Sequence, residues 1–217
     1  LTLLIAKSGI EVVFVDVSDE RVKEIEICLS HRLDDEINHW GMTSSEKRLV
    51  LSRIKGTADY NGLSDCDIVI EAISSRKRGT MIEVRQDLFR QIESVVKEDT
   101  IISSQLSTLI ISDLANSLKK PERAIGIHFI DPIAKTQIVE VGRGQNSSDY
   151  AFKQISRLCN MLKRTVVAVN ESPGNISTRM IIPFINDACE LLSEGVASIE
   201  DIDLTMKEAS GHHIGPF

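Results

Sequence analysis

The regular alternation of short apolar runs with segments of helical periodicity is the feature that most constrains how this chain folds. The apolar runs, rich in Ile and Val, occupy residues 10–15, 67–72, 100–104, 124–129, 137–141 and 165–169. Intervening segments, residues 18–40, 80–96, 109–118 and 149–162, repeat apolar side chains every three or four positions, as helices with one buried face do. A strand that is buried on both faces has a nearly continuous apolar sequence. The alternation therefore predicts a mostly parallel sheet that helices cover on both sides.

The alternation stops near Pro173, and this change predicts two domains. We expect residues 1–170 to form a Rossmann-like, doubly wound α/β domain and residues 171–217 to form the first helices of an all-α domain, with one helix over 181–192. Residues 1–7 take the place of the phosphate-binding helix of a Rossmann unit, so the first strand and the glycine-rich loop are expected to precede Leu1. Gly142-Arg143-Gly144 lacks a third glycine and a following helix, and is expected to be a turn. Capping residues that predict helix starts are Ser18, Thr43 and Ser198.

Composition excludes several classes of protein. The chain has 217 residues and a formal charge of −7, which argues against a nucleic-acid-binding surface. No apolar run approaches the roughly 18 residues of a membrane span, so no membrane partner is expected. The four cysteines form no C-x-x-C pair and predict reduced thiols and a cytoplasmic protein. His212-His213 has no partner at metal-ligand spacing, so no metal is expected.

Asp16 closes the first apolar run. An acidic side chain at the end of the second strand of a doubly wound sheet can bind both ribose hydroxyls of an adenosine. It would repel a 2′-phosphate, which favours NAD over NADP. An Asp in this place is also common as a turn or cap residue.

His128 ends another apolar run, at the edge where doubly wound sheets bind their ligands. Imidazole titrates in the range that a general base requires. Asp131-Pro132 turns the chain, and the run at 137–141 can return beside the first, which would bring Glu140 to His128. Without further context, a histidine in this position is more often structural.

Seven blocks of sequence, in order, resemble the 3-hydroxyacyl-CoA dehydrogenase family. They are I-E-V-V-F-V-D (10–16), D-C-D-I-V-I-E-A (65–72), I-I-S-S-Q-L-S-T-L (101–109), I-G-I-H-F-I-D-P (125–132), V-E-V (139–141), S-P-G-N-I-S-T-R (172–179) and E-G-V-A-S-I-E-D-I-D (194–203). The resemblance covers essentially the whole chain.

This resemblance implies an NAD-dependent oxidoreductase of fatty acid metabolism that interconverts 3-hydroxyacyl-CoA and 3-oxoacyl-CoA by hydride transfer. His128 would be the base, Glu140 its orienting partner, and Ser107 the residue that binds the reacting oxygen; Ser107 is alternatively the N-cap of the helix near 109. The implied cofactor contacts are Asp16, Ala72, Gln105 and Asp131, and the implied substrate contacts are Ser107 and Thr178. The full-length protein would be a homodimer.

Departures from the family pattern leave the substrate more open than the hydride chemistry. Gln105, Asp131 and Thr178 stand where the family has Asn, and Thr loses the amide's two donors. Ser75 replaces a family Glu, in a longer loop whose basic residues 76–78 either bind a phosphate or are simply solvated. The alternatives are the same chemistry on a short hydroxyacyl unit bound to a carrier protein, a relative of gulonate dehydrogenase acting on a sugar acid, and a non-catalytic scaffold.

Overall fold

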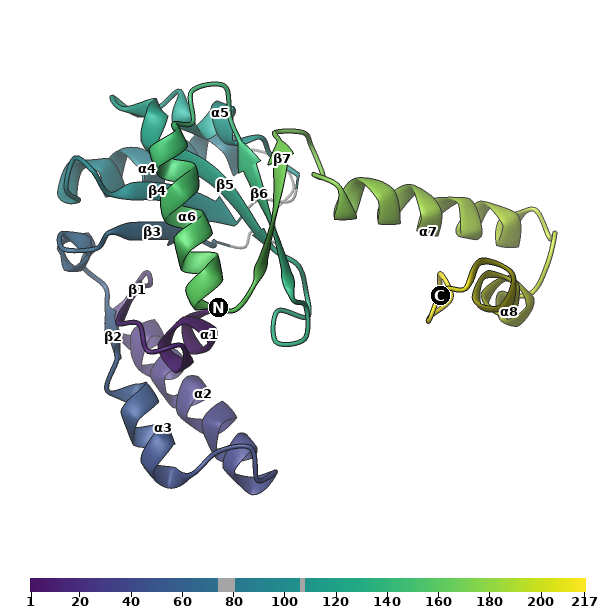
Figure 1. Cartoon of the computed structure of the whole chain (residues 1–217), viewed down its shortest axis with the longest axis horizontal. Helices are drawn as coiled ribbons and strands as arrows, with labels where there is room; N and C mark the ends of the chain where they lie inside the picture. Colours follow the sequence, from purple (N-terminus) through teal and green to yellow (C-terminus); the bar gives the residue numbers. More distant parts are fainter. Residues whose placement is uncertain (74–80, 106–107) are drawn as a thin grey trace.

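The structure, a computed structural model, describes residues 1–73, 81–105 and 108–217 (Figure 1). Ser107, Ser75 and the basic residues 76–78 lie outside the described residues. The helices are α1 (Thr2–Lys7), α2 (Asp19–Asn38), α3 (Ser44–Leu51), α4 (Met81–Val95), α5 (Ile111–Ala115), α6 (Asp149–Met161), α7 (Ser177–Ser193) and α8 (Ile199–Ser210), with 3₁₀ turns at Tyr60–Leu63 and Pro121–Arg123. The strands are β1 (Val12–Val15), β2 (Ile54–Thr57), β3 (Ile68–Glu71), β4 (Ile101–Gln105), β5 (Ala124–Phe129), β6 (Ile138–Arg143) and β7 (Thr165–Asn170).

The strands form a five-stranded sheet in the order β3-β4-β5-β6-β7 and a two-stranded parallel sheet, β1-β2. β3, β4 and β5 are parallel, β6 runs antiparallel to β5, and β7 is parallel to β6. The expected return of the chain beside β5 is therefore present. Its register pairs His128 directly with Glu140, and directly paired residues project their side chains from the same face of a sheet.

Helices cover both faces of the larger sheet, as the apolar runs predict. Successive residues of a strand point to opposite faces, and Ile101 and Ile102 accordingly lie in different core clusters. Ile102 packs with Phe89 of α4 and with residues of α5. Ile101 packs with Ile155 of α6, the helix in front of the sheet in Figure 1. The predicted fold class, a Rossmann-like sheet followed by helices, is confirmed.

Side-chain caps begin several helices at the expected residues. The Ser18 hydroxyl accepts a hydrogen bond from the amide of Arg21, and the Ser198 hydroxyl accepts one from the amide of Asp201. Thr43 and Glu46 form a reciprocal capping box at α3. Each cap satisfies an amide that the first helical turn leaves without a backbone partner.

β2 was not expected, because its sequence, I-K-G-T, has no apolar run. It is formed by pairing with β1 rather than by its own composition. Gly56 is required there, since a Cβ would lie 2.4 Å from Val22 Cγ1 and 2.6 Å from Phe14 Cζ. The strand thus depends on close packing under α2 that a single sequence does not reveal.

Three expected boundaries were wrong. The helix expected over 109–118 spans only Ile111–Ala115. Gly142 and Arg143 belong to β6 instead of a turn, because pairing with β7 continues as far as Asn170. α7 begins at Ser177, before the expected residue 181, and Pro183 lies inside it. The earlier start matters for function, because it brings the first turn of α7 to the sheet.

α7 and α8 extend away from the sheet (Figure 1). Many of their apolar side chains are exposed; Met180 of α7 is 70% exposed and Leu204 of α8 57%, and Val196 between the two helices is 63% exposed. The ring of His212 packs against Phe184 with centroids 5.3 Å apart. In the described ranges, no helix is both long and apolar enough to cross a membrane.

Candidate active site

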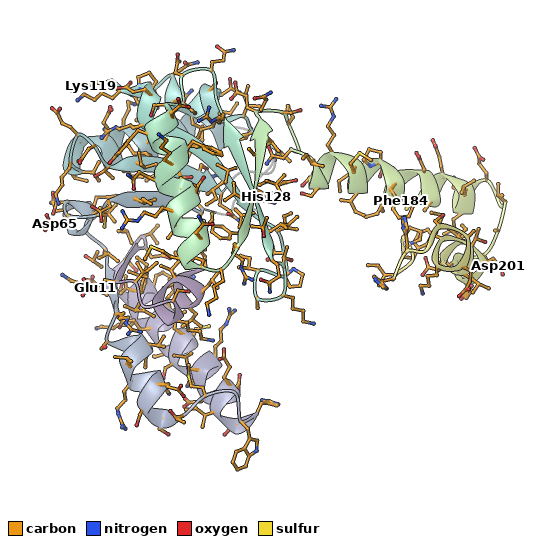
Figure 2. All side chains as sticks on the ribbon, in the orientation of Figure 1. Glu11, Asp65, Lys119, His128, Phe184 and Asp201 are labelled. Atoms are coloured by element: carbon orange, nitrogen blue, oxygen red, sulfur yellow. The ribbon has the colours of Figure 1, made fainter. Side chains whose placement is uncertain are left out.

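His128 and Glu140 form a hydrogen-bonded pair on neighbouring strands. His128 Nδ1 lies 2.9 Å from Glu140 Oε2, and Figure 2 labels His128 on the strands of the large sheet. A carboxylate only accepts hydrogen bonds, so Nδ1 carries the proton and Nε2 is the nitrogen that can accept another. The imidazole is 13% exposed and the Glu140 side chain 3% exposed. The contact expected between the two side chains is present.

The first turn of α7 holds the other side of the Glu140 carboxylate. Oε1 accepts the amides of Ile176 at 3.2 Å and Ser177 at 2.8 Å. Oε2 also accepts the Ser177 hydroxyl at 3.0 Å. Burial alone would raise the pKa of Glu140, but the hydrogen bonds from His128 and Ser177 and the charge of His128 outweigh it and lower that pKa. Glu140 is therefore a stable anion beside the imidazole.

A turn between β7 and α7 directs the helix at Glu140. Gly174 has φ of +85° and Asn175 of +46°, in the left-handed region. A Cβ on Gly174 would lie 3.1 Å from the amide of Arg179, whose nitrogen donates to the Gly174 carbonyl at 3.1 Å. The S-P-G-N segment thus needs glycine both for its backbone angle and for space.

Gln105 ends β4, and its side-chain amide binds the backbone of the residue after His128. Nε2 donates to the carbonyl of Phe129 at 3.0 Å, and Oε1 accepts the amide of Phe129 at 3.2 Å. These two bonds tie the end of β4 to the end of β5. In this structure the amide of Gln105 fixes the strand that carries His128.

The remaining predicted site residues follow the carboxyl ends of β1, β3 and β5 or lie in the first turn of α7. Asp16 follows β1, is half-buried, and accepts the amide of Val17 at 2.7 Å. Ala72 follows β3, and the exposed Asp131 lies in the turn after β5, next to a cis peptide to Pro132. Thr178 is the second residue of α7. No group of three or more His, Cys, Asp or Glu within the described ranges could hold a metal ion.

A second buried carboxylate, Glu71, lies at the end of β3. Arg85 of α4 forms an ion pair with Glu71 Oε2, which also accepts the Ser104 hydroxyl. Glu71 Oε1 accepts the amide of Ile73 at 2.6 Å, and Arg85 Nη2 donates to the Ile73 carbonyl at 2.8 Å. This network fixes the backbone of the first residues beyond β3.

Sequence reasoning did not find Ser177, Arg85 or the contact of Gln105 with Phe129. A polar residue three positions after P-G is a usable signal for Ser177, because a glycine turn often precedes a helix start. Arg85 had no such signal, since it lies 14 residues from Glu71 on a different element.

A sheet edge with a half-buried acidic residue after β1 and a His–Glu pair on β5 and β6 fits a dinucleotide-dependent oxidoreductase. Residues 1–172 match the family model "3-hydroxyacyl-CoA dehydrogenase, NAD binding domain", and residues 174–217 match "3-hydroxyacyl-CoA dehydrogenase, C-terminal domain". The chain belongs to the 3-hydroxyacyl-CoA dehydrogenase family. The expected family, NAD as cofactor and the oxidoreductase class are thereby confirmed.

Named relatives agree with this assignment. The chain is 36% identical over 170 residues to the 3-hydroxybutyryl-CoA dehydrogenase of Clostridioides difficile, covering 78% of this chain and 59% of the relative. It is 33% identical over 211 residues to the probable 3-hydroxybutyryl-CoA dehydrogenase of Deinococcus radiodurans, covering 97% and 74%. The solved (S)-3-hydroxybutyryl-CoA dehydrogenase PaaH1 of Ralstonia eutropha superposes with a TM-score of 0.91 at 35% identity, covering 99% and 74%. The chain thus spans about three fifths to three quarters of the length of these proteins.

Proposed function

We propose that this chain supplies the cofactor-binding and proton-transfer parts of an NAD-dependent dehydrogenase acting on short 3-hydroxyacyl-CoA thioesters. The His128–Glu140 pair carries the proposal, because its 2.9 Å contact leaves Nε2 of the imidazole as the acceptor at the ligand-binding edge of the sheet. The relatives' names favour a substrate of the 3-hydroxybutyryl-CoA kind. The intact pair also argues against the scaffold alternative.

Oxidation of the substrate removes the hydroxyl proton and the hydride on C3. A bound NAD would supply the acceptor for that hydride. His128 accepts the hydroxyl proton on Nε2, and the Glu140 anion stabilises the imidazolium that results. In the reverse direction the imidazolium returns the proton to the oxygen. Ser107, assigned from its motif, would hold that oxygen, and the Thr178 hydroxyl would contact the substrate from α7.

The residues present fit NAD at its adenosine end. Asp16 is half-buried at the carboxyl end of β1, and its bond to the amide of Val17 at 2.7 Å orients the carboxylate. Ribose hydroxyls are good donors to such a carboxylate, whereas a 2′-phosphate would meet a like charge. Asp16 and Ala72 are the described residues that we propose to contact NAD. Asp131 is a candidate further along the same edge, and Gln105 supports the site through Phe129.

The substrate is tested by steady-state assays of the intact protein. NADH should form from NAD and (S)-3-hydroxybutyryl-CoA, and acetoacetyl-CoA should oxidise NADH. The same hydroxyacyl group on phosphopantetheine of a carrier protein should react with lower kcat/KM. A preference for the carrier-bound substrate would favour that alternative, and no turnover with either, despite NAD binding, would contradict the proposed activity.

We further propose a cytoplasmic homodimer. The exposed apolar side chains of α7 and α8, such as Met180 and Leu204, support an assembled state, because such surfaces usually become covered. Sedimentation analysis should give twice the chain mass, and cell fractionation should find the protein in the soluble fraction. A monomer at micromolar concentration would contradict the dimer.

A further inference from the structure

The Glu140 carboxylate is shared between the imidazole and α7. It accepts four hydrogen bonds in all, one from His128 and three from the segment Ile176–Ser177. The carboxylate is therefore saturated, although only His128 belongs to the sheet. The three bonds from α7 come from the first turn of a helix, where amide groups point at an anion and the helix dipole favours negative charge.

One of these four bonds falls on the atom that His128 uses. Ser177 Oγ donates to Oε2 at 3.0 Å, and His128 Nδ1 lies 2.9 Å from the same oxygen. The two backbone amides instead bind Oε1. A hydrogen bond to a carboxylate oxygen withdraws electron density from it, so the hydroxyl weakens the attraction of Oε2 for the imidazolium.

We propose that Ser177 is a positioning residue whose hydroxyl, by sharing Glu140 Oε2 with His128, limits how strongly the carboxylate attracts the imidazolium. A base for alcohol oxidation must be unprotonated at neutral pH, and an unshared buried carboxylate would favour the protonated imidazolium. Ser177 thus keeps His128 available as a base while Glu140 still orients it. The consequence for catalysis rests on the proposed role of His128; the effect on the imidazole itself does not.

Other charged groups on the segments around the pair bind other partners or are exposed. They include Asp131 after β5, Arg143 on β6, Glu171 before α7 and Arg179 on α7. Arg143 pairs with Asp149 at 2.6 Å, and the Arg179 guanidinium donates to the Ser172 hydroxyl at 2.8 Å. The Glu171 carboxylate accepts the Ser112 hydroxyl at 2.6 Å, and Asp131 is exposed. None of these four is among the groups that lower the pKa of Glu140, which are His128 and Ser177, acting against burial, which raises it.

The test measures the titration of His128 in Ser177→Ala, in Ser177→Thr and in a matched control. Ser193→Ala removes a serine hydroxyl from the same helix; that hydroxyl donates at 2.9 Å to the carbonyl of Glu190, far from the pair. NMR of ¹³C-labelled imidazole in the intact protein without substrate gives the His128 pKa, with the resonance assigned by its absence in His128→Gln. Ser177→Ala should raise that pKa by about 0.5 unit, a fraction of a charged hydrogen bond. Ser177→Thr and Ser193→Ala should leave it unchanged.

The same variants then give a kinetic readout that a merely structural role would not produce. On the acidic side of the pH profile, Ser177→Ala should lose about threefold in kcat/KM for oxidation, the factor that 0.5 unit implies. Reduction, which needs the protonated form, should extend to higher pH by the same 0.5 unit. An unchanged or lowered His128 pKa in Ser177→Ala would overturn the inference, since a carboxylate that simply became disordered would bind the imidazolium less well. If Ser177→Ala raises the His128 pKa but the wild-type protein has no dehydrogenase activity, the proposed function is overturned and this inference stands.

Discussion

Two buried carboxylates lie at the same edge of the sheet, Glu140 beside β5 and Glu71 at the end of β3, and their partners differ in kind. Glu140 is paired with His128, and Glu71 with Arg85. An imidazole gains and loses a proton near neutral pH, whereas a guanidinium stays charged in proteins. Only the first pair can exchange a proton with a substrate; the second can only hold structure.

Their neighbours follow the same division. The Glu71 network ends on the backbone of Ile73, whose amide and carbonyl are both bound. The Glu140 network leaves one imidazole nitrogen outside it. Burial of a carboxylate at a sheet edge is therefore not enough to indicate catalysis. The identity of the partner decides between a chemical and a structural role.

The largest expected effect is on the pair at β5. His128→Gln should lower kcat by about 10³-fold, within the range for loss of a general base, since the amide cannot take the proton. NAD affinity, measured by fluorescence titration, should change less than twofold because the ring acts on substrate. A variant that keeps a tenth of wild-type kcat would show that another group is the base.

The second-largest effect is expected from breaking the Glu71–Arg85 ion pair at the end of β3. Arg85→Met leaves Glu71 charged and buried without its cation, which should lower the free energy of unfolding by about 3–5 kcal/mol. Urea denaturation followed by circular dichroism measures the change. The double variant Glu71→Gln/Arg85→Met should recover most of the loss, because it removes the buried charge. Equal destabilisation in both variants would show that packing, not charge, holds this edge.

Glu140→Gln should reduce kcat about 10- to 100-fold, less than loss of the imidazole, because it removes orientation and charge but leaves the base.

Glu140→Gln should also change how the free energy of unfolding depends on pH in acid. The folded-state pKa of Glu140 is lowered from 4.5, so its ionised form stabilises the fold above that value, and the contribution is lost as pH falls through the folded-state pKa. The difference in urea midpoint between wild type and Glu140→Gln should therefore be constant near neutrality and shrink below about pH 4.5. A difference that grows on acidification would contradict the assigned direction.

A third carboxylate, Asp16, sharpens the comparison because it is only half-buried. Asp16→Ser should weaken NAD binding about tenfold, through loss of hydrogen bonds to the ribose worth roughly 1.5 kcal/mol. It should also reduce the ratio of NAD affinity to NADP affinity. The free energy of unfolding should change by less than about 0.5 kcal/mol, as for most surface positions. Undiminished NAD affinity would place the ribose elsewhere.

Sequence reasoning recovered the parts of the fold that local pattern controls. Apolar runs such as 124–129 identified strands because both faces of the sheet are buried. The predicted chain reversal between β5 and β6 correctly placed Glu140 beside His128. β2 was missed because pairing with β1 and the space under Val22 define it, rather than its own side chains. In the site, too, contacts set by local sequence could be predicted and contacts set by tertiary packing could not.

The pair could be predicted because a single chain reversal connects its members, and the family motifs marked both. Ser177 could not, because its contact with Glu140 spans 37 residues and depends on where α7 begins. Arg85 could not, because its partner is fixed only when α4 packs on β3. The catalytic roles of His128 and Glu140 are predictions that the experiments above address, and the roles of Ser107 and Thr178 are predictions from the family motifs.

The antiparallel course of β6 also has a consequence for the order of folding. His128 and Glu140 are 12 residues apart, whereas Glu140 and Ser177 are 37 apart. Closing the longer loop costs about 1 kcal/mol more in chain entropy, since each doubling of length adds roughly 0.6 kcal/mol. Formation of the β5–β6 hairpin should therefore precede docking of α7, so that the imidazole meets its carboxylate before the helix arrives. Pulsed hydrogen exchange during refolding should protect the amide of Val141 earlier than that of Ser177, making α7 the last piece to enter the site and the first to leave it.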